Sequence, residues 1–417
     1  FGVTSNRSVL LLLTLLVFLP VFAQSDAEAP GSPFLERSIT QTEDAVTITV
    51  AVPSDTETRE LFGVPLYKRK IQPVWLEIAN DRETPITFLP LGLDPEYFTP
   101  IESAFLGAGS ASEADTNMRK LFFDRRINLF IDPGEKRTGF MFTRLQEGTK
   151  SFNVDVYTDD ERIVNFTFFV PVPGLRLDHQ DVDWDNLYPE DQIRDLDKDA
   201  LIEALTAMPC CTTDKKSEGS GDPLNLVVIG AVDDVYYAFL RAGWDETEVI
   251  SRTSLTKMAK AFVTVSEYRY SPVSGLYVFG RPQDVALQKA RDKIDERKHL
   301  RLRMSPLRFE GVPDWVGQIS RDIGVRLTAK TITTHKVDPD VDETREYVVE
   351  NLAYSQALAI LGYVDGVGEA TIDAPRANLT GDPYFTDGKR GVLWISSQPK
   401  NFGEIEDLDW GAHPIRS

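Results

Sequence analysis

Hydrophobic and polar residues alternate along several short segments in the first 175 residues. The clearest of these segments are 46–50, 74–78, 86–89, 140–142, 152–157 and 164–170. Alternation with a period of two is typical of strands with one buried face, and turn-forming pairs such as Asn80-Asp81 and Glu147-Gly148 separate the segments. We therefore predict an all-β, sandwich-like domain over residues 37–175, with one helical insertion at 111–123.

A different pattern begins at residue 223. Residues 224–230 form an apolar run that leads directly into 232–240, where apolar side chains recur at helical spacing. The later elements that the pattern predicts are strands at 276–279, 300–304 and 315–327, a helix at 343–361 ended by Gly362, and a strand at 391–396. Because strands and helices do not alternate regularly, we predict an α+β domain with a mixed sheet over residues 223–417.

Composition separates the two regions. Between Asp178 and Asp222 the chain has 13 acidic and four basic residues. We predict that residues 176–222 form an acidic linker with one short helix at 199–207. Residues 24–36 are polar and contain proline, which predicts a flexible leader before the first domain.

Residues 1–23 have the features of a secretory signal peptide. Arg7 precedes an apolar run from Val9 to Leu19, and the small Ala23 provides a cleavage site before Gln24. A retained membrane anchor is the alternative, although the run is shorter than the roughly 20 residues of a spanning helix. No later segment is apolar enough to span a bilayer. We expect an exported protein, periplasmic or extracellular, without a transmembrane span in the mature chain.

The charge of the chain narrows the range of partners. The composition is that of a globular protein, at 42% hydrophobic and 26% charged residues, with a formal net charge of −20. Residues 1–222 contribute −16 of this charge and residues 223–417 only −4. An acidic surface repels nucleic acid and anionic membranes, so we expect neither as a main partner.

The chain contains two cysteines, Cys210 and Cys211, at neighbouring positions. A bridge between neighbours requires a distorted turn, and the pair has no metal-ligand spacing. We interpret the two residues as thiols in the linker. The alternative is a redox switch or an intermolecular link.

Acidic residues are concentrated just after His335. Three aspartates alternate there: Asp338, Asp340 and Asp342. Asp340 and Glu343 have the spacing of a capping box, in which acidic side chains accept from the free N–H groups of a helix start. The alternative is a divalent-cation site, because alternating aspartates suit Ca²⁺ or Mg²⁺. An EF-hand is excluded, since Glu343 and Val349 stand where that loop has glycine and glutamate.

Basic residues dominate the segment 297–303. If its leucines face the core, the opposite face of the strand carries His299, Arg301 and Arg303. Three such groups on one face make a clamp for phosphate or carboxylate. The alternative is a solvated basic edge strand, whose charges discourage pairing with other chains.

Short motifs run through the second domain. They are 222–227, Gly243-Trp244, 271–274, 276–277, 279–284, 299–302, 315–317, 334–335 and 337–342, together with Ser320, Asp322, Gly324 and Arg345. In this combination, residues of about 223–397 resemble the LssY-like C-terminal domain family of bacterial proteins. The family pattern has a second histidine before His299; Lys298 stands there in this chain, which argues against a metal site with two imidazoles.

The resemblance implies a location and a shared polar site, but no defined reaction. Relatives attach the domain to membrane proteins that resemble lipid-phosphate phosphatases, which implies a role with envelope or polyprenyl lipids. The family's polar positions coincide with the residues singled out above. The expected ligand-binding residues are Arg281, His299, Arg301, Asp322 and Arg345. The expected metal ligands are Asp338, Asp340 and Asp342.

The sequence contains no complete catalytic signature: G-x-S-x-G, H-E-x-x-H, P-loop and C-x-x-C patterns are all absent. We therefore predict a non-catalytic cell-envelope protein that binds a phosphorylated lipid or glycan, or an envelope protein. The alternative is a metal-assisted hydrolase or transferase acting on such a ligand, with His299 or His335 as acid–base. Either function requires the predicted residues to converge in one pocket.

Overall fold

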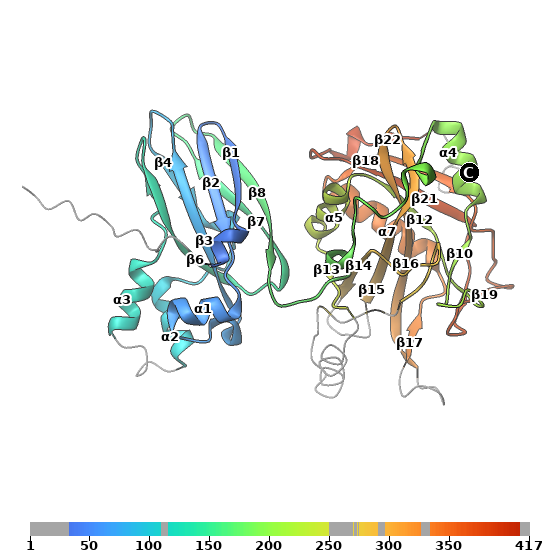
Figure 1. Cartoon of the computed structure of the whole chain (residues 1–417), viewed down its shortest axis with the longest axis horizontal. Helices are drawn as coiled ribbons and strands as arrows, with labels where there is room; N and C mark the ends of the chain where they lie inside the picture. Colours follow the sequence, from blue (N-terminus) through green and yellow to red (C-terminus); the bar gives the residue numbers. More distant parts are fainter. Residues whose placement is uncertain are drawn as a thin grey trace, which may run out of the picture.

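The computed structural model describes residues 33–109, 116–249, 270, 273, 275–290, 297–326 and 334–408. Figure 1 shows two domains: an N-terminal domain with strands β1 to β8 and a C-terminal domain with strands β9 to β22. Within the described residues no helix is long and apolar enough to cross a membrane.

The N-terminal domain contains two four-stranded antiparallel sheets. The first has the order β1 (Ile39–Glu43), β2 (Val46–Ala51), β3 (Ile71–Asn80) and β6 (Lys136–Arg144). The second has the order β5 (Phe130–Ile131), β4 (Ile86–Leu89), β7 (Gly148–Tyr157) and β8 (Ile163–Val172). Side chains from both sheets, such as Val50, Leu76, Val154 and Phe166, share one hydrophobic core. The predicted β-rich N-terminal domain is therefore confirmed, and its two sheets on one core agree with a sandwich-like arrangement.

Helices add a second core to this domain. They are α1 (Asp55–Phe62), α2 (Pro100–Ala108) and α3 (Thr116–Asp124), with the 3₁₀ turns η1 (Pro33–Arg37), η2 (Leu66–Arg69) and η3 (Pro90–Gly92). Phe62 and Phe122 pack against Phe140 and Phe142 of β6. The predicted helix at 111–123 corresponds to α3, although 111–115 lie outside the described residues. α1 and α2 are short helices that the prediction did not include.

The C-terminal domain is built on a ten-stranded mixed sheet. Its main path runs β13 (Asp245–Glu246), β14 (Val285–Ala290), β15 (Arg297–Phe309), β16 (Val312–Arg326), β12 (Leu226–Ile229), β21 (Lys389–Ile395), β18 (Leu358–Asp365) and β22 (Glu406–Asp407). β17 (Thr334–Val337) pairs with β16, and β9 (Arg194–Leu196) pairs with β15. β12 is parallel to β21 and antiparallel to β16, which confirms the predicted mixed sheet.

Helices cover both faces of this sheet (Figure 1). On one face, α5 (Val232–Arg241) and α7 (Val341–Tyr354) pack against apolar side chains that include Leu226 and Leu300. On the other face, α4 (Lys198–Ala207) packs against Val227 and Val316. The shorter elements are η4 (Asp178–Asp181), η5 (Glu190–Gln192), η6 (Phe402–Glu404) and the strand pairs β10 (Cys211–Thr213) with β11 (Ser220–Pro223) and β19 (Arg376–Ala377) with β20 (Pro383–Tyr384).

Residues 176–222 are not a linker. β9 pairs in parallel with the end of β15, and Leu201 and Leu205 of α4 are fully buried against the sheet. The prediction averaged the charge of the whole segment, which hid the apolar residues at helical spacing within it. The acidic side chains of this segment lie on a folded part of the C-terminal domain.

Two element boundaries also differ from the prediction. α7 ends at Tyr354 rather than at residue 361, and Gly362 lies inside β18. The apolar residues of the helix and of the strand follow one another so closely that periodicity alone could not divide them. Residues 276–279, predicted as a strand, instead lead into a turn in which Phe279 and Gly280 both have positive φ.

The two domains meet at the start of β7. The backbone N–H and the hydroxyl of Thr149 donate to the carboxylate of Glu246 in β13, over 2.6 and 2.8 Å. Gly148 has a positive φ of 76°, and a Cβ atom at this position would lie only 2.0 Å from a carboxylate oxygen of Glu246. Phe169 stacks on Tyr237 of α5 with 4.1 Å between the ring centres. Burial raises the pKa of Glu246 to about 7, while its hydrogen bonds with Thr149 oppose the rise.

We predict that Glu246→Gln removes a pH-dependent loss of stability. The folded pKa of about 7 lies above the ordinary 4.5, so the unfolded state releases its proton first as the pH rises. Wild type should therefore lose up to about 3 kcal/mol between these pH values, and Glu246→Gln should not. Urea unfolding at pH 5 and pH 8 measures the difference, with the exposed Glu350→Gln as control. An equal effect of Glu246→Gln at both pH values would contradict the prediction.

Candidate functional site

A row of buried polar side chains runs along one face of β15. These side chains, which we call the β15 polar face, are Arg297, His299, Arg301, Arg303 and Ser305. None is more than 6% exposed. Leu300 and Leu302 point to the opposite face, where they join the core under α5 and α7. β15 has β14 on one side and β16 on the other, so the alternative of a solvated edge strand is wrong.

His299 is held by Asp322 of β16. The two atoms His299 Nε2 and Asp322 Oδ2 are 2.6 Å apart, and Arg297 Nε lies 3.8 Å from the same oxygen. Burial lowers the pKa of His299 to about 4; the charge of Asp322 opposes this effect, and those of Arg297 and Arg301 add to it. His299 is therefore neutral near pH 7 and donates its Nε2–H to the carboxylate, which can only accept.

Three guanidinium groups share the face with this neutral imidazole. Arg297 Nη1 donates to Gln288 Oε1 and Arg301 Nη1 to Gln318 Oε1, both over 2.7 Å. The pKa of Arg297 falls to about 10 and that of Arg303 to about 9. Burial is the main cause of both shifts, and the charge of Arg301 contributes to each of them. All three groups stay protonated at neutral pH, so the fold holds like charges together away from water.

Arg303 has few hydrogen-bond acceptors among the described residues. Its side chain is fully buried, and Nη2 donates to the backbone oxygen of Leu276. Its Nε and Nη1 have no hydrogen-bond acceptor within the part of the chain that the structure describes. Two buried donors of a charged group in this state leave room for an acceptor from outside the chain.

Burial raises the pKa of three acidic groups near the β15 polar face. Burial raises the pKa of Asp178 to about 6, and it also raises the pKa of Asp222; the charge of Arg301 opposes both shifts. Asp284 pairs with Arg281, whose Nη2 also donates to Tyr188 Oη over 2.9 Å. Burial raises the pKa of Asp284 as well, against the opposing charge of Arg281. Burial therefore disfavours the negative form of these acids, whereas the arginines keep their charge.

The three aspartates after His335 accept hydrogen bonds from the protein. Asp340 is the N-cap of α7, with Oδ1 accepting from the backbone N–H of Glu343 over 3.0 Å, which confirms the predicted cap. Asp338 accepts from the N–H of Asp340, and Asp342 from Thr386 Oγ1. The described residues contain no group of three or more His, Cys, Asp or Glu that could hold a metal ion. A Ca²⁺ or Mg²⁺ site at Asp338, Asp340 and Asp342 stays a prediction.

Arg345 is a buried clamp between α7 and β21. Its side chain is 1% exposed, and its two terminal nitrogens each lie 3.0 Å from one carboxylate oxygen of Asp387. Nη1 also contacts Asp342 and the backbone oxygen of Lys389, and Nε donates to Glu346 over 2.8 Å. Protein acceptors thus surround the whole guanidinium, which gives Arg345 a structural role rather than the predicted ligand-binding one.

The described contacts divide the predicted site residues into two groups. One group contains Arg281, His299, Arg301 and Asp322 around the β15 polar face. The other lies at the start of α7, a helix that packs on the opposite face of the sheet, and contains Asp338, Asp340, Asp342 and Arg345. The backbone of His335 pairs with Val325, but the side chain of His335 lies outside the described residues. Val337, the residue before Asp338, pairs with Asp322, so the two groups approach each other beside β16. Convergence of all the predicted residues in one pocket stays a prediction.

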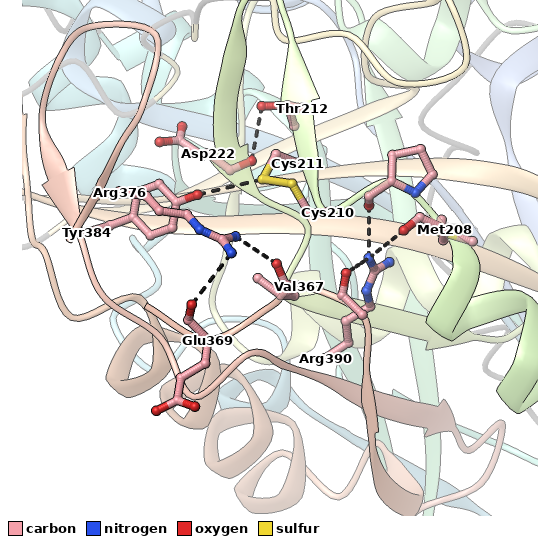
Figure 2. Close-up of a disulfide and its surroundings, with 12 residues drawn as sticks. Met208, Cys210, Cys211, Thr212, Asp222, Val367, Glu369, Arg376, Tyr384 and Arg390 are labelled. Carbon is pink, nitrogen blue, oxygen red and sulfur yellow. Dashed lines mark hydrogen bonds between the residues drawn. A yellow bond between two sulfur atoms is a disulfide. The ribbon is translucent and has the colours of Figure 1, made fainter. Parts of the chain in front are cut away.

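Cys210 and Cys211 form a disulfide, which corrects their interpretation as free thiols. Figure 2 shows the sulfur of Cys211 facing the hydroxyl of Tyr384, 3.6 Å away. Just before the bridge, Arg390 Nη2 donates to the backbone oxygens of Met208 and Pro209 (Figure 2). The bridge therefore lies in an anchored turn between α4 and β10. The sequence analysis argued against a bridge because neighbouring cysteines require a distorted turn. The contacts that hold this turn cannot be read from the spacing of the two cysteines.

We predict that Arg345→Met destabilises the C-terminal domain by about 3 kcal/mol, because it removes a buried cation that pairs with three partly buried acids. Arg321→Met is the matched control, since Arg321 pairs with the exposed Glu343 and should cost less than about 1 kcal/mol. Urea unfolding of both variants measures the two costs. Equal costs would contradict the clamp.

Comparison with known families agrees with this organisation. Residues 203–389 match the family described as LssY C-terminus, a range that runs from within α4 to the first residue of β21. It includes the β15 polar face, the disulfide and the start of α7. No curated protein matches the chain. The C-terminal domain of this chain is an LssY-like C-terminal domain, as its motifs predicted.

Proposed function

We propose that this chain is an exported bacterial cell-envelope protein that binds an anionic ligand at the β15 polar face. The observation that carries the proposal is the set of three buried guanidinium groups, Arg297, Arg301 and Arg303, on one strand. Burying like charges side by side costs free energy in the folded state. A phosphate or carboxylate among them would offset that cost and could accept from Arg303 Nε and Nη1, which have no acceptor among the described residues.

The geometry of arginine favours a phosphate-bearing ligand. A guanidinium presents its donors in a planar fork that matches the oxygens of phosphate or carboxylate. Arg303 has two donors, Nε and Nη1, without an acceptor among the described residues. Neutral His299 adds no charge, so it suits a hydrogen-bonding role beside the anion. A phosphorylated lipid or glycan is the ligand class that fits the envelope setting which the family resemblance implies.

Two features support export. Residues 1–23 have the pattern of a signal peptide. In addition, the only two cysteines of the chain are joined in a disulfide, and disulfides persist mainly in oxidising compartments such as the periplasm or the extracellular space. Cell-envelope ligands are available in those compartments. An envelope protein with an anionic group could bind at the β15 polar face in the same way.

Catalysis is the second candidate function, with a metal-assisted hydrolase or transferase as its form. His299 is a poor general base, because an imidazole with a pKa of about 4 accepts few protons near pH 7. The aspartates after His335 are engaged in capping and in contacts with Thr386 and Asp387. Binding without chemistry therefore agrees better with these contacts.

The test is a titration of the purified mature chain with farnesyl diphosphate, a short isoprenoid diphosphate, with farnesol as the uncharged control. We predict that Arg303→Met abolishes the thermal stabilisation by farnesyl diphosphate without lowering the stability of the free protein. The second part follows because the variant removes a buried charge that Arg301 repels. Arg308→Met, at an exposed position of the same strand, should bind like wild type.

Three outcomes would contradict the proposal. Farnesol could stabilise the protein as strongly as the diphosphate, which would show that the charge is not recognised. Arg303→Met could retain the full shift in melting temperature, which would place the ligand elsewhere. Release of inorganic phosphate from farnesyl diphosphate, dependent on added Mg²⁺, would favour the catalytic alternative.

A further inference from the structure

A cavity of about 1000 Å³ lies between the two domains, away from the β15 polar face. The N-terminal domain contributes Lys70, Arg144 and Lys150 to its lining, and the C-terminal domain contributes Arg241 from the end of α5 and Gln356 from the turn after α7. The volume is that of a site for a sugar-sized or larger small molecule.

The charge of this cavity is opposite to that of the chain around it. Its lining contains four cationic side chains, Lys70, Arg144, Lys150 and Arg241, and one carboxylate, Asp94. Residues 1–222, which supply three of these cations, carry a net charge of −16. Arg144 is partly neutralised by Asp94, at 3.5 Å, and by Glu96, at 2.7 Å. A basic cavity in an acidic surrounding attracts anions into a defined place.

Lys150 is the most unusual of these cations. It is 4% exposed, in β7, and its Nζ donates to the backbone oxygen of Arg144 over 2.8 Å. Burial lowers the pKa of Lys150 to about 7; Asp94 opposes this shift and Arg144 adds to it. Asp94 itself already accepts from the backbone N–H groups of Glu96 and Arg144. Asp94 therefore compensates the charge of the Lys150 ammonium only in part. An oxyanion bound in the cavity would provide a second counter-ion.

Uncharged groups complete the lining. Amides and hydroxyls are provided by Gln146, Ser151, Asn153 and Thr167, and apolar surface by Phe169, which stacks on Tyr237 of the other domain. Hydroxyl and amide groups around a cationic centre suit a polar molecule with a charged end. Because the cations come from both domains, one ligand would contact both.

We infer that this cavity binds a small polar molecule that carries a phosphate or carboxylate group and bridges the two domains. The site is separate from the β15 polar face, so the inference goes beyond the proposed function and does not depend on it. The cations of both domains hold the oxyanion, and the amides and hydroxyls hold the polar body. Bound ligand then fixes the domains against each other.

The test compares charge removal inside and outside the cavity in the purified mature chain. Lys70→Ala/Arg241→Ala removes one exposed cation from each domain, and Lys68→Ala/Arg308→Ala removes one exposed cation from each domain outside the cavity. Calorimetric titration at low salt uses glucose 6-phosphate and citrate as probes and glucose as the neutral control. The two oxyanions test phosphate and carboxylate separately.

We predict that at least one of the two oxyanions binds and that glucose does not. Lys70→Ala/Arg241→Ala should weaken this binding about tenfold or more, because it removes two charged hydrogen-bond donors from the lining of the cavity. Lys68→Ala/Arg308→Ala should leave the affinity within about twofold, since neither residue lines the cavity and solvent screens exposed charges outside it. Lys150→Met, which keeps the apolar volume, should abolish binding while the free protein stays folded.

The inference is overturned by any of three results. No heat with either oxyanion would show that the cavity has no such ligand. Equal losses in the two double variants would show that only the overall charge matters. Loss of binding in Arg303→Met but not in Lys70→Ala/Arg241→Ala would place the anion at the β15 polar face. Melting temperatures of all variants verify that each one is folded.

Discussion

The burial of three arginines on a central strand is the constraint on which the C-terminal domain depends. β15 lies between β14 and β16, so Arg297, Arg301 and Arg303 cannot reach water as they would on an edge strand. Charges in this position require acceptors and counter-charges from the rest of the fold. Gln288, Gln318 and Asp322 of the neighbouring strands provide part of these.

The acidic segment 176–222 provides another part. Asp178 and Asp222 stand near its two ends, and both interact with the charge of Arg301. The acidic residues of this segment therefore have a role in the fold, because they lie near a basic strand. A flexible linker would have no such need for acidic residues. The same reasoning applies to Arg345, whose bonds to Asp387 and to the backbone oxygen of Lys389 hold α7 to the start of β21, and to Lys150 in the cavity between the domains. In each case a buried cation determines which distant segments must come together.

Local patterns were sufficient to predict the strands and helices that have one clear periodicity. β2, β4, β8 and α5 lie where alternation or helical spacing placed them. Periodicity was insufficient where two elements share one apolar run, as at the boundary of α7 and β18. β14 was missed, since its buried residues Val285 to Gln288 carry no alternation.

The candidate site was predictable only in part, for a related reason. The shared face of His299, Arg301 and Arg303 follows from the two-residue period of a strand, so the sequence was enough. The partners of these residues were not predictable, because Asp178 and Asp222 approach them through tertiary folding alone. The motif at 337–342 attracted attention through its charge, yet its charge is explained by the start of a helix and by Arg345. The density of charged residues in the sequence identified both the β15 polar face and the segment 337–342. It could not distinguish a ligand-binding site from a network of structural contacts.

The most direct measurement of the central claim is the position of a heavy oxyanion in crystals of the protein. Tungstate has the shape and charge of phosphate and gives a strong anomalous signal. The account predicts an anomalous peak at the β15 polar face, within hydrogen-bond distance of Arg303 Nε or Nη1. Peaks confined to surface lysines, with Arg303 unchanged and no ion beside it, would contradict the claim that the buried arginines form an anion site.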